Sequence, residues 1–168
     1  MSRLDINIRR LEAQRACLNL VAEAIRDLPG PVLELGLGNG RTYDHLRELL
    51  PEREIFVFER EVAAHPDCIP DPGHLYRGDF HDTLPAAAAR FTGRVALVHA
   101  EIGSEIGPAN LERDATLAAF VAGHLPVLLR PGGIVASDRD VGFEGARPLA
   151  LPEDLAPGVY HLYRRPLV

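Results

Sequence analysis

A glycine-rich stretch is the part of the sequence that most directly suggests chemistry. Residues 32–42 read VLELGLGNGRT, with Gly36, Gly38 and Gly40 at alternate positions after an apolar run that contains Glu34. Glycine adopts positive φ angles easily and lets a ligand approach the main chain with no Cβ in between. Where such a turn leads from a strand into a helix, the free amides at the helix start can bind a carboxylate or a phosphate. The stretch therefore predicts a site for an anionic or nucleoside-like ligand.

The spacing of the glycines separates the candidate ligands. A phosphate-binding P-loop requires Gly-Lys-Ser or Gly-Lys-Thr, and the chain has no lysine, since each of its 18 basic residues is arginine. The dinucleotide fingerprint GxGxxG, begun at Gly36, requires a small residue at the position of Arg41. A P-loop is therefore excluded and a dinucleotide is disfavoured. The pattern that fits is an acidic residue followed by three alternate glycines, from Glu34 to Gly40.

This pattern resembles the glycine-rich motif of the class I S-adenosyl-L-methionine-dependent methyltransferases, and further motifs follow in that family's order. The run IFVFER places Glu59 at the end of the expected second strand, and RGDF places Asp79 and Phe80 after the third. The run LLRPGGIVASD is similar to the family's usual entry into the fifth strand. The resemblance covers roughly residues 32–138. It implies a Rossmann-like methyltransferase fold with S-adenosyl-L-methionine as the cofactor.

The resemblance also implies roles for individual residues. Glu59 would bind both ribose hydroxyls, which a carboxylate does well because charge-assisted hydrogen bonds are roughly twice as strong as neutral ones. Asp79 would lie near the adenine amino group and Phe80 beside the ring. Glu34 would orient either the cofactor's amino group or the glycine turn itself. The cofactor-binding residues expected on this basis are Glu34, Gly36, Leu37, Gly38, Asn39, Gly40, Glu59, Arg60, Asp79, Phe80 and His99.

Catalytic residues are sought where the expected fourth strand ends. Methyl transfer from a sulfonium depends mainly on holding the nucleophile and the methyl group in line, so a general base is optional. His99 and Glu101 are the candidates for such a base. An equally weighted alternative has His99 pointing into the sheet and Glu101 capping the next helix. Methyltransferases that act on amino groups of nucleobases or glutamine commonly carry Asn or Asp, then Pro-Pro and an aromatic residue at this point, and this chain does not.

A metal site is not expected. The metal-dependent catechol-type O-methyltransferases place one Asp after the fourth strand and an Asp-Asn pair after the fifth. Asp138 matches the first member of that pair, but Arg139 stands at the second. Arginine is a cation that cannot ligate a metal ion.

The elements that must position these residues form an α/β pattern. Apolar residues at helical spacing predict an amphipathic helix from Leu4 to Leu28, and after it short apolar runs alternate with longer helical segments. This alternation predicts a doubly wound, mostly parallel sheet with helices on both faces. The tail predicts a short or truncated antiparallel strand pair. We expect one domain over residues 1–168, with an N-terminal helix in 1–30, a cofactor-binding core in 31–140 and C-terminal strands in 141–168.

Composition narrows the class of protein further. The net charge is −6 and no stretch combines basic with aromatic residues, so a nucleic-acid partner is not expected. No apolar run approaches the length of a membrane span, and the charged N-terminal segment does not resemble a secretory signal. Cys17 and Cys68 are isolated, as expected of reduced thiols. We therefore expect a cytoplasmic protein without a membrane partner, in which a homodimer is left open.

These observations lead to one expected function and two alternatives. The expected function is enzymatic transfer of a methyl group from S-adenosyl-L-methionine to a small-molecule acceptor through an oxygen, nitrogen or sulfur atom. The first alternative is a non-catalytic module that binds or senses S-adenosyl-L-methionine. The second is an NAD(P)-dependent reductase, against which Arg41 and the Pro-Gly-Gly segment argue.

Overall fold

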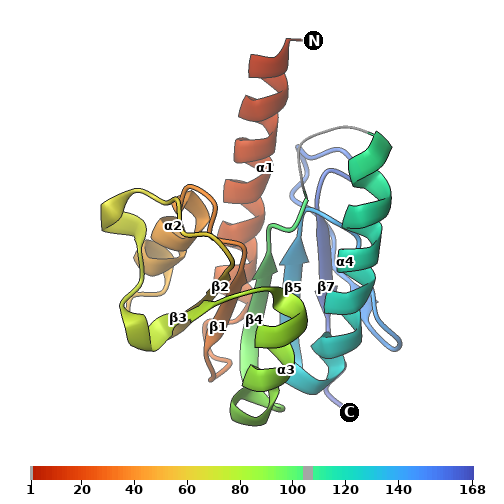
Figure 1. Cartoon of the computed structure of the whole chain (residues 1–168). Coiled ribbons are helices and arrows are strands. Elements are labelled where there is room, and N and C mark those ends of the chain that lie inside the picture. The colour runs from red at the N-terminus through yellow and green to blue at the C-terminus, as the bar shows by residue number, and fades with distance from the viewer. Residues whose placement is uncertain (1, 104–107) are drawn as a thin grey trace.

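The described part of the chain forms a seven-stranded sheet with helices on both faces (Figure 1). The structure is a computed structural model, and it describes residues 2–103 and 108–168. The strands are β1 (Val32–Leu35), β2 (Ile55–Glu59), β3 (Leu75–Arg77), β4 (Val95–Ala100), β5 (Leu129–Ser137), β6 (Arg147–Pro148) and β7 (His161–Arg164). Their order across the sheet is β3-β2-β1-β4-β5-β7-β6.

The direction of the strands confirms the predicted doubly wound fold. Strands β1 to β5 pair in parallel, whereas β7 is antiparallel to both β5 and β6. The C-terminal antiparallel pair is thus present, and its first member is the two-residue strand β6. The chain order reverses at β1 and β4, so the carboxyl ends of these strands mark the place where ligands bind in open α/β sheets.

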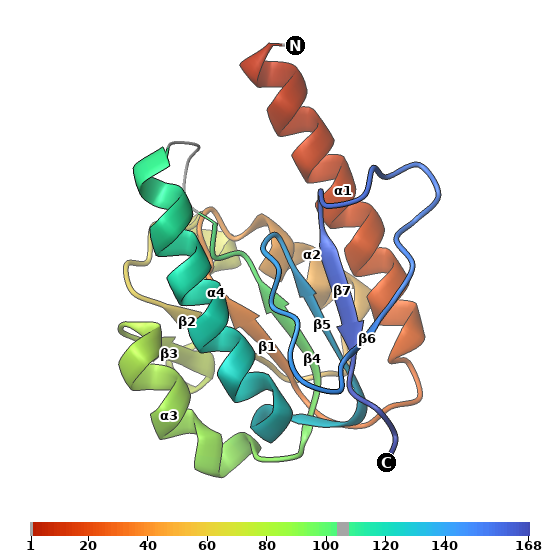
Figure 2. The same ribbon diagram turned by 90° about the vertical axis from the view of Figure 1, so that its right-hand side faces the viewer.

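The helices cover the two faces of the sheet in pairs (Figure 2). They are α1 (Arg3–Ala24), α2 (Arg41–Leu49), α3 (Phe80–Phe91) and α4 (Pro108–Leu128), and two short 3-10 turns, η1 (Pro66–Cys68) and η2 (Pro72–His74), precede β3. Helices α1 and α2 pack on one face, and α3 and α4 on the other. Because both faces are covered, the central strands are buried along nearly their whole length, as their continuous apolar runs indicated.

Helix α1 is packed along only half of its length. From Ala13 onward it buries apolar residues against the sheet, but residues 2–12 are all exposed and extend beyond the carboxyl ends of the strands (Figure 1). Ser2 and Asp5 form a capping box that defines the helix start. The amphipathic pattern that began at Leu4 therefore corresponds to a buried face only in the second half, because the first half extends beyond the sheet.

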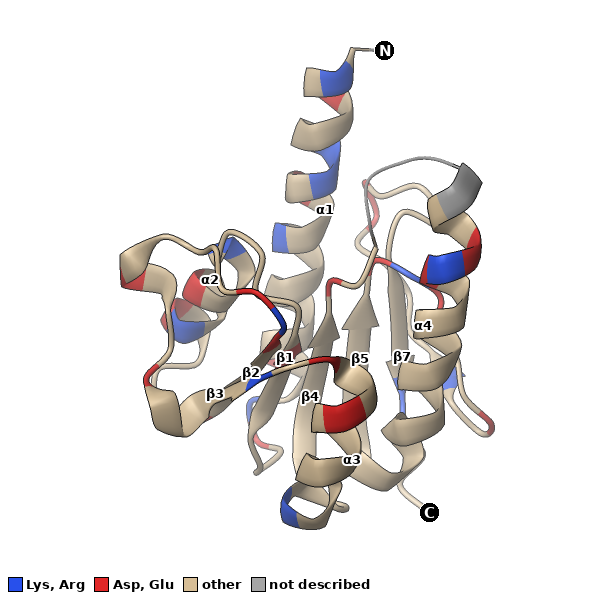
Figure 3. Ribbon diagram, in the orientation of Figure 1, with Lys and Arg blue, Asp and Glu red and all other residues tan. Residues whose placement is uncertain are grey.

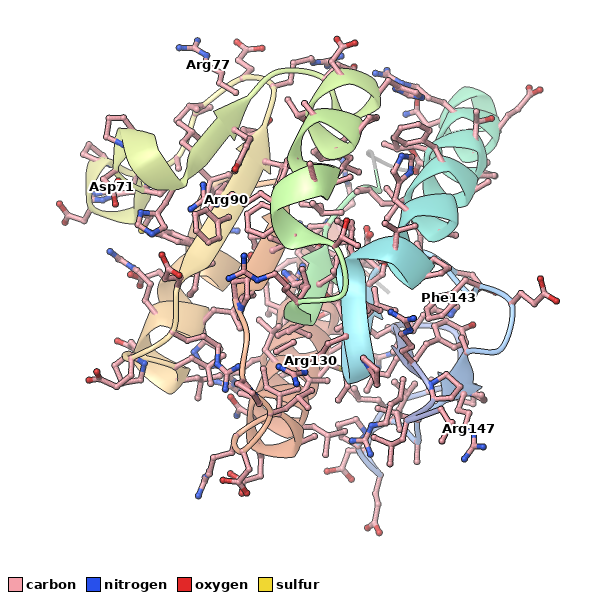
Figure 4. All side chains as sticks on the ribbon, turned by 90° about the horizontal axis from the view of Figure 1, so that it is seen from below. Asp71, Arg77, Arg90, Arg130, Phe143 and Arg147 are labelled. Carbon is pink, nitrogen blue, oxygen red and sulfur yellow. The ribbon has the colours of Figure 1, made fainter. Side chains whose placement is uncertain are left out.

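At the opposite end of the sheet, arginine side chains bind main-chain carbonyl groups; one of these arginines, Arg130, is labelled in Figure 4. Arg53 donates hydrogen bonds to the carbonyl groups of Ile25, Leu28 and Gly30 after α1, and Arg130 donates to the carbonyl group of Pro29. Carbonyl groups after a helix end need donors from outside the helix, and one guanidinium supplies several. The hydrogen bonds of these two arginines therefore stabilise the fold.

Two leucines of α1 distinguish its packed half from its projecting half. Leu18 is 1% exposed and Leu4 is 67% exposed. Leu18→Ala leaves a cavity, so we expect it to lower the free energy of unfolding by about 2–5 kcal/mol. The matched control, Leu4→Ala, should change it by less than about 0.5 kcal/mol. Urea denaturation measures both values, and equal losses would contradict the described packing of α1.

Candidate functional site

The glycine-rich turn joins β1 to α2 and uses glycine for two different reasons. Gly36, Gly38 and Gly40 have φ angles of 92°, 49° and 82°, a region that disfavours residues with a side chain. A Cβ on Gly36 would lie 2.4 Å from the carbonyl oxygen of Glu101, and one on Gly40 would lie 2.4 Å from Cβ of Cys68. A Cβ on Gly38 would meet no atom of the described chain within 4 Å. Of these three glycines, only Gly38 therefore has open space where a side chain would lie.

Glu59 holds the amides of this turn. Its Oε2 accepts hydrogen bonds from the amides of Leu37 at 2.8 Å and Gly38 at 3.2 Å, while Oε1 accepts one from the amide of Glu61 at 3.1 Å. The carboxylate at the end of β2 is thus held in place by main-chain donors. Its remaining acceptor capacity is directed at a cavity that it lines.

Two cavities meet at the carboxyl ends of the central strands. The smaller, of about 170 Å³, lies between α1 and the glycine turn and is lined by Arg10, Gln14 and Asn39 among others. The larger, of about 660 Å³, lies between the ends of β2 and β3 and the start of α4. Gly36 and Glu101 line both cavities, so Glu101 lies at their junction. Acidic residues gather around these strand ends (Figure 3).

The expected cofactor-binding residues separate into two groups around these cavities. Leu37, Gly38 and Asn39 line the smaller cavity, and Glu59, Arg60, Asp79 and Phe80 line the larger. Asp79 also caps α3, since its Oδ1 accepts a hydrogen bond from the amide of His81. Glu34 and His99 line neither cavity and are fully buried.

Glu34 and His99 belong to a buried polar row across the sheet. Glu34 pairs with His99 in register between β1 and β4, and His99 pairs with Ala136 of β5. The Glu34 carboxylate binds the Thr42 hydroxyl at 2.5 Å through Oε1 and Nδ1 of His99 at 2.6 Å through Oε2. Both oxygens therefore face protein groups.

The buried polar row consists of Glu34, His99, Tyr160 and Glu101, and Tyr160 connects its enclosed part to the cavities. Its hydroxyl lies 2.5 Å from Nε2 of His99 and donates a hydrogen bond to Oε1 of Glu101 at 2.6 Å. Gln14 of α1 and Glu101 line the smaller cavity together. The side chain of Glu101 is 15% exposed, whereas that of His99 is fully enclosed. Of the two candidates for a general base, only Glu101 therefore reaches a ligand directly.

Electrostatics fixes the charges within the row. Burial disfavours a charged ring, but the carboxylates of Glu34 and Glu101 outweigh it and raise the pKa of His99 to about 10. Burial also opposes ionisation of Glu101, but contacts with His99 and Tyr160 hold its pKa below the usual range. Burial, with the neighbouring Glu101 carboxylate, raises the pKa of Tyr160 well above its ordinary value. At neutral pH His99 is thus an imidazolium, Glu101 a carboxylate and Tyr160 a neutral phenol.

Asp138 and Arg139 hold the end of β5 in place. The Asp138 carboxylate accepts hydrogen bonds from the amides of Ile102 and Gly103, and Arg139 forms an ion pair with Asp114 at 2.9 Å. Burial, followed by the charge of Glu101, raises the pKa of Asp138. Within residues 2–103 and 108–168, no group of three or more His, Cys, Asp or Glu side chains is arranged to hold a metal ion.

Three residues of the site were not found by sequence reasoning. Arg10 and Gln14 come from α1, which we predicted only as an amphipathic helix, and Tyr160 comes from the C-terminal segment. The position of Arg10 and Gln14 on the side of α1 that becomes buried further along was an available signal. Tyr160 carried no signal, because its partners lie about sixty residues away in the chain.

Comparison with known proteins relates the whole chain to one family. A family model described as S-adenosyl-L-methionine methyltransferase matches residues 1–165. The crystal structure of an S-adenosyl-L-methionine methyl transferase from Silicibacter pomeroyi DSS-3 is 44% identical in sequence. The alignment covers 98% of this chain and 99% of that one, with a TM-score of 0.90. A search of curated proteins found no match.

A more distant structure supports the fold. Human methyltransferase-like protein 13, solved in complex with SAH, aligns with a TM-score of 0.61 at 15% identity. The alignment covers 94% of this chain and 82% of the human one. None of the helices in the described ranges is long and apolar enough to cross a membrane.

The charged state of His99 predicts how stability depends on pH. The folded protein holds the ring proton to about pH 10, whereas the unfolded chain loses it near 6.5. The groups that face the ring are Glu34, Glu101 and Tyr160. Because the folded-state pKa is raised, the stabilisation is complete below the unfolded pKa and is lost as the pH rises through this interval.

We therefore expect the free energy of unfolding to fall between about pH 6.5 and about pH 10 more steeply in the wild type than in the double variant Glu34→Gln/His99→Gln. The double variant lacks this titration and retains all other titrating groups, so the difference between the two curves isolates the buried pair. Urea denaturation at several pH values measures it. Parallel curves would contradict a charged His99.

Proposed function

The chain belongs to the S-adenosyl-L-methionine methyltransferase family, and we propose that its cofactor spans the two joined cavities, with the amino acid end in the smaller and the adenosine in the larger. The observation that carries this proposal is the sharing of Gly36 and Glu101 by both cavities. S-adenosyl-L-methionine has a zwitterionic end and a nucleoside end joined at the sulfonium. Membership of this family sets aside the nicotinamide-dependent reductase and the non-catalytic module.

The chemistry of the smaller cavity suits an amino acid group. Arg10 and the side chain of Asn39 offer donors to a carboxylate, and the side-chain oxygen of Gln14 offers an acceptor to an ammonium group. Gly38 lets the ligand lie against the main chain, since it adds no side chain on that side. Glu34 does not face the cavity. It accepts a hydrogen bond from the Thr42 hydroxyl after the glycine turn, so Glu34 is a positioning residue.

The chemistry of the larger cavity suits a nucleoside. Glu59, already held by the turn amides, accepts hydrogen bonds from the two ribose hydroxyls, and Asp79 and Phe80 face the adenine from the start of α3. Arg60 lines the same cavity and lies beside the nucleoside. In this arrangement the sulfonium is placed near the junction, next to Glu101.

The reaction at this junction is an in-line displacement. The acceptor atom forms a bond to the methyl carbon as the carbon–sulfur bond breaks, and the electron pair of that bond stays on the sulfur as it becomes a neutral thioether. If the acceptor starts protonated, its proton leaves to Glu101 or to water. The enclosed ring of His99 does not reach the acceptor, so His99 acts only through its contact with Glu101.

We propose a small molecule as the acceptor. The part of the larger cavity beyond the nucleoside, toward Glu112 and Leu117 of α4, is the room available for it. The net charge of −6 disfavours a polynucleotide. The two free cysteines, Cys17 and Cys68, support a reducing compartment such as the cytoplasm.

Isothermal titration tests the proposed cofactor site. We expect the wild type to bind S-adenosyl-L-methionine and its demethylated product S-adenosyl-L-homocysteine. Glu59→Gln should weaken both by about 10- to 100-fold, because a charge-assisted hydrogen bond to the ribose is lost. Glu61→Gln changes the neighbouring exposed acid and is expected to bind like the wild type. Absence of binding to the wild type at about millimolar ligand, a level equivalent to about −4 kcal/mol, would contradict the proposal.

A further inference from the structure

We propose that Tyr160 is a positioning residue that holds Glu101 as a fixed anion at the junction of the two cavities, so that the site binds the sulfonium cofactor in preference to its uncharged thioether product. This inference rests on the cofactor arrangement proposed above. It assigns a function to the C-terminal segment, which lies outside the motifs that carry the resemblance to the family. It also assigns a role to the buried contact between His99 and Tyr160 behind Glu101.

The sheet geometry explains how Tyr160 reaches Glu101. Ala136 of β5 pairs with Leu162 of β7, and Tyr160 precedes Leu162 by two residues, so both point to the same face. Ala136 also pairs with His99 of β4 on its other side. Ala136, Tyr160 and Leu162 belong to one core cluster, and on this face the Tyr160 hydroxyl lies 2.5 Å from Nε2 of His99. Tyr160 is 2% exposed, so the contact is shielded from water.

The order of donors in the row leaves the Tyr160 hydroxyl with one orientation. The His99 imidazolium has a proton on each nitrogen, so Nδ1 donates to Glu34 and Nε2 donates to the Tyr160 oxygen. The single phenolic proton is then directed at Oε1 of Glu101. Glu101 is therefore held by Tyr160 while it lines both cavities.

The charges of the row do not cancel at the junction. The single cation of the row, His99, lies between two acidic side chains, 2.6 Å from Glu34 and 3.6 Å from Glu101, and therefore does not neutralise both. His99 is enclosed, whereas the Glu101 carboxylate faces the cavities. A sulfonium beside it gains a favourable interaction that the product loses once its sulfur becomes neutral, and partial burial strengthens that interaction. The carboxylate thus distinguishes the positively charged sulfonium from the neutral sulfur that the reaction leaves.

The test compares affinities for the charged cofactor and the neutral product. Isothermal titration of the whole chain with S-adenosyl-L-methionine and S-adenosyl-L-homocysteine gives a preference ratio for each variant. We expect the wild type to prefer S-adenosyl-L-methionine. Tyr160→Phe should lower that preference by about tenfold, with affinity for the product within about threefold of the wild type, because the fixed carboxylate acts on the sulfur charge.

Two further variants make the result specific. Glu101→Gln should lower the preference at least as much as Tyr160→Phe does. The double variant Tyr160→Phe/Glu101→Gln should lose no more of the preference than Glu101→Gln alone, because both changes act through one carboxylate. Tyr163→Phe is the matched control. Tyr163 lies on β7 and its hydroxyl donates to Asp140, which follows β5, and neither residue lines the two cavities, so the preference should stay that of the wild type.

Each contrary result has a distinct meaning. Equal weakening of both ligands in Tyr160→Phe would reduce Tyr160 to a structural role and overturn the inference. If Tyr160→Phe fails to fold, an unchanged preference in Glu101→Gln would overturn it as well. A wild type that binds both ligands equally would also contradict the inference while leaving the proposed cofactor site intact. A wild type that binds neither ligand would contradict the proposed function itself.

Discussion

A carboxylate buried in the middle of a sheet must be paired, and the pairing of Glu34 organises the site. Glu34 is fully buried in β1, where an isolated negative charge would be too costly to keep. His99 and Thr42 supply the partners, and the charge on His99 then requires an acceptor on its other nitrogen. Tyr160 provides it and in turn directs its proton to Glu101. One buried charge thereby connects β1, β4 and the C-terminal segment to the cavities.

The glycine turn is shaped by protein neighbours as well as by its ligand. Gly36 is bare because the carbonyl group of Glu101 leaves no space, and Gly40 because Cys68 packs against it. Gly38 is the position that opens toward the smaller cavity. The sequence pattern of three alternate glycines therefore combines two packing requirements with one binding requirement. The contact of Gly36 with Glu101 also fixes the turn next to the junction of the cavities.

Local patterns in the sequence were enough to predict the elements and the side of the sheet that binds the ligand. The apolar runs, the Gly-rich turn and the acids Glu59 and Asp79 are each recognisable within a few residues. The pairing of Glu34 with His99 depends on the adjacency of β1 and β4, which are far apart in sequence. Propensity and periodicity contain no information on such neighbours. For the same reason Tyr160 was missed, and the exposure of the first half of α1 was not foreseen.

A crystal structure with S-adenosyl-L-homocysteine tests most directly whether the cofactor spans the two cavities. We predict that the amino acid end lies among Arg10, Asn39 and the turn amides, that Glu59 contacts the ribose, and that the sulfur lies beside Glu101. Tyr160 should still donate its hydrogen bond to Glu101 in that complex. A product whose amino acid end lies outside the cavity at α1, or whose sulfur lies away from Glu101, would contradict this arrangement.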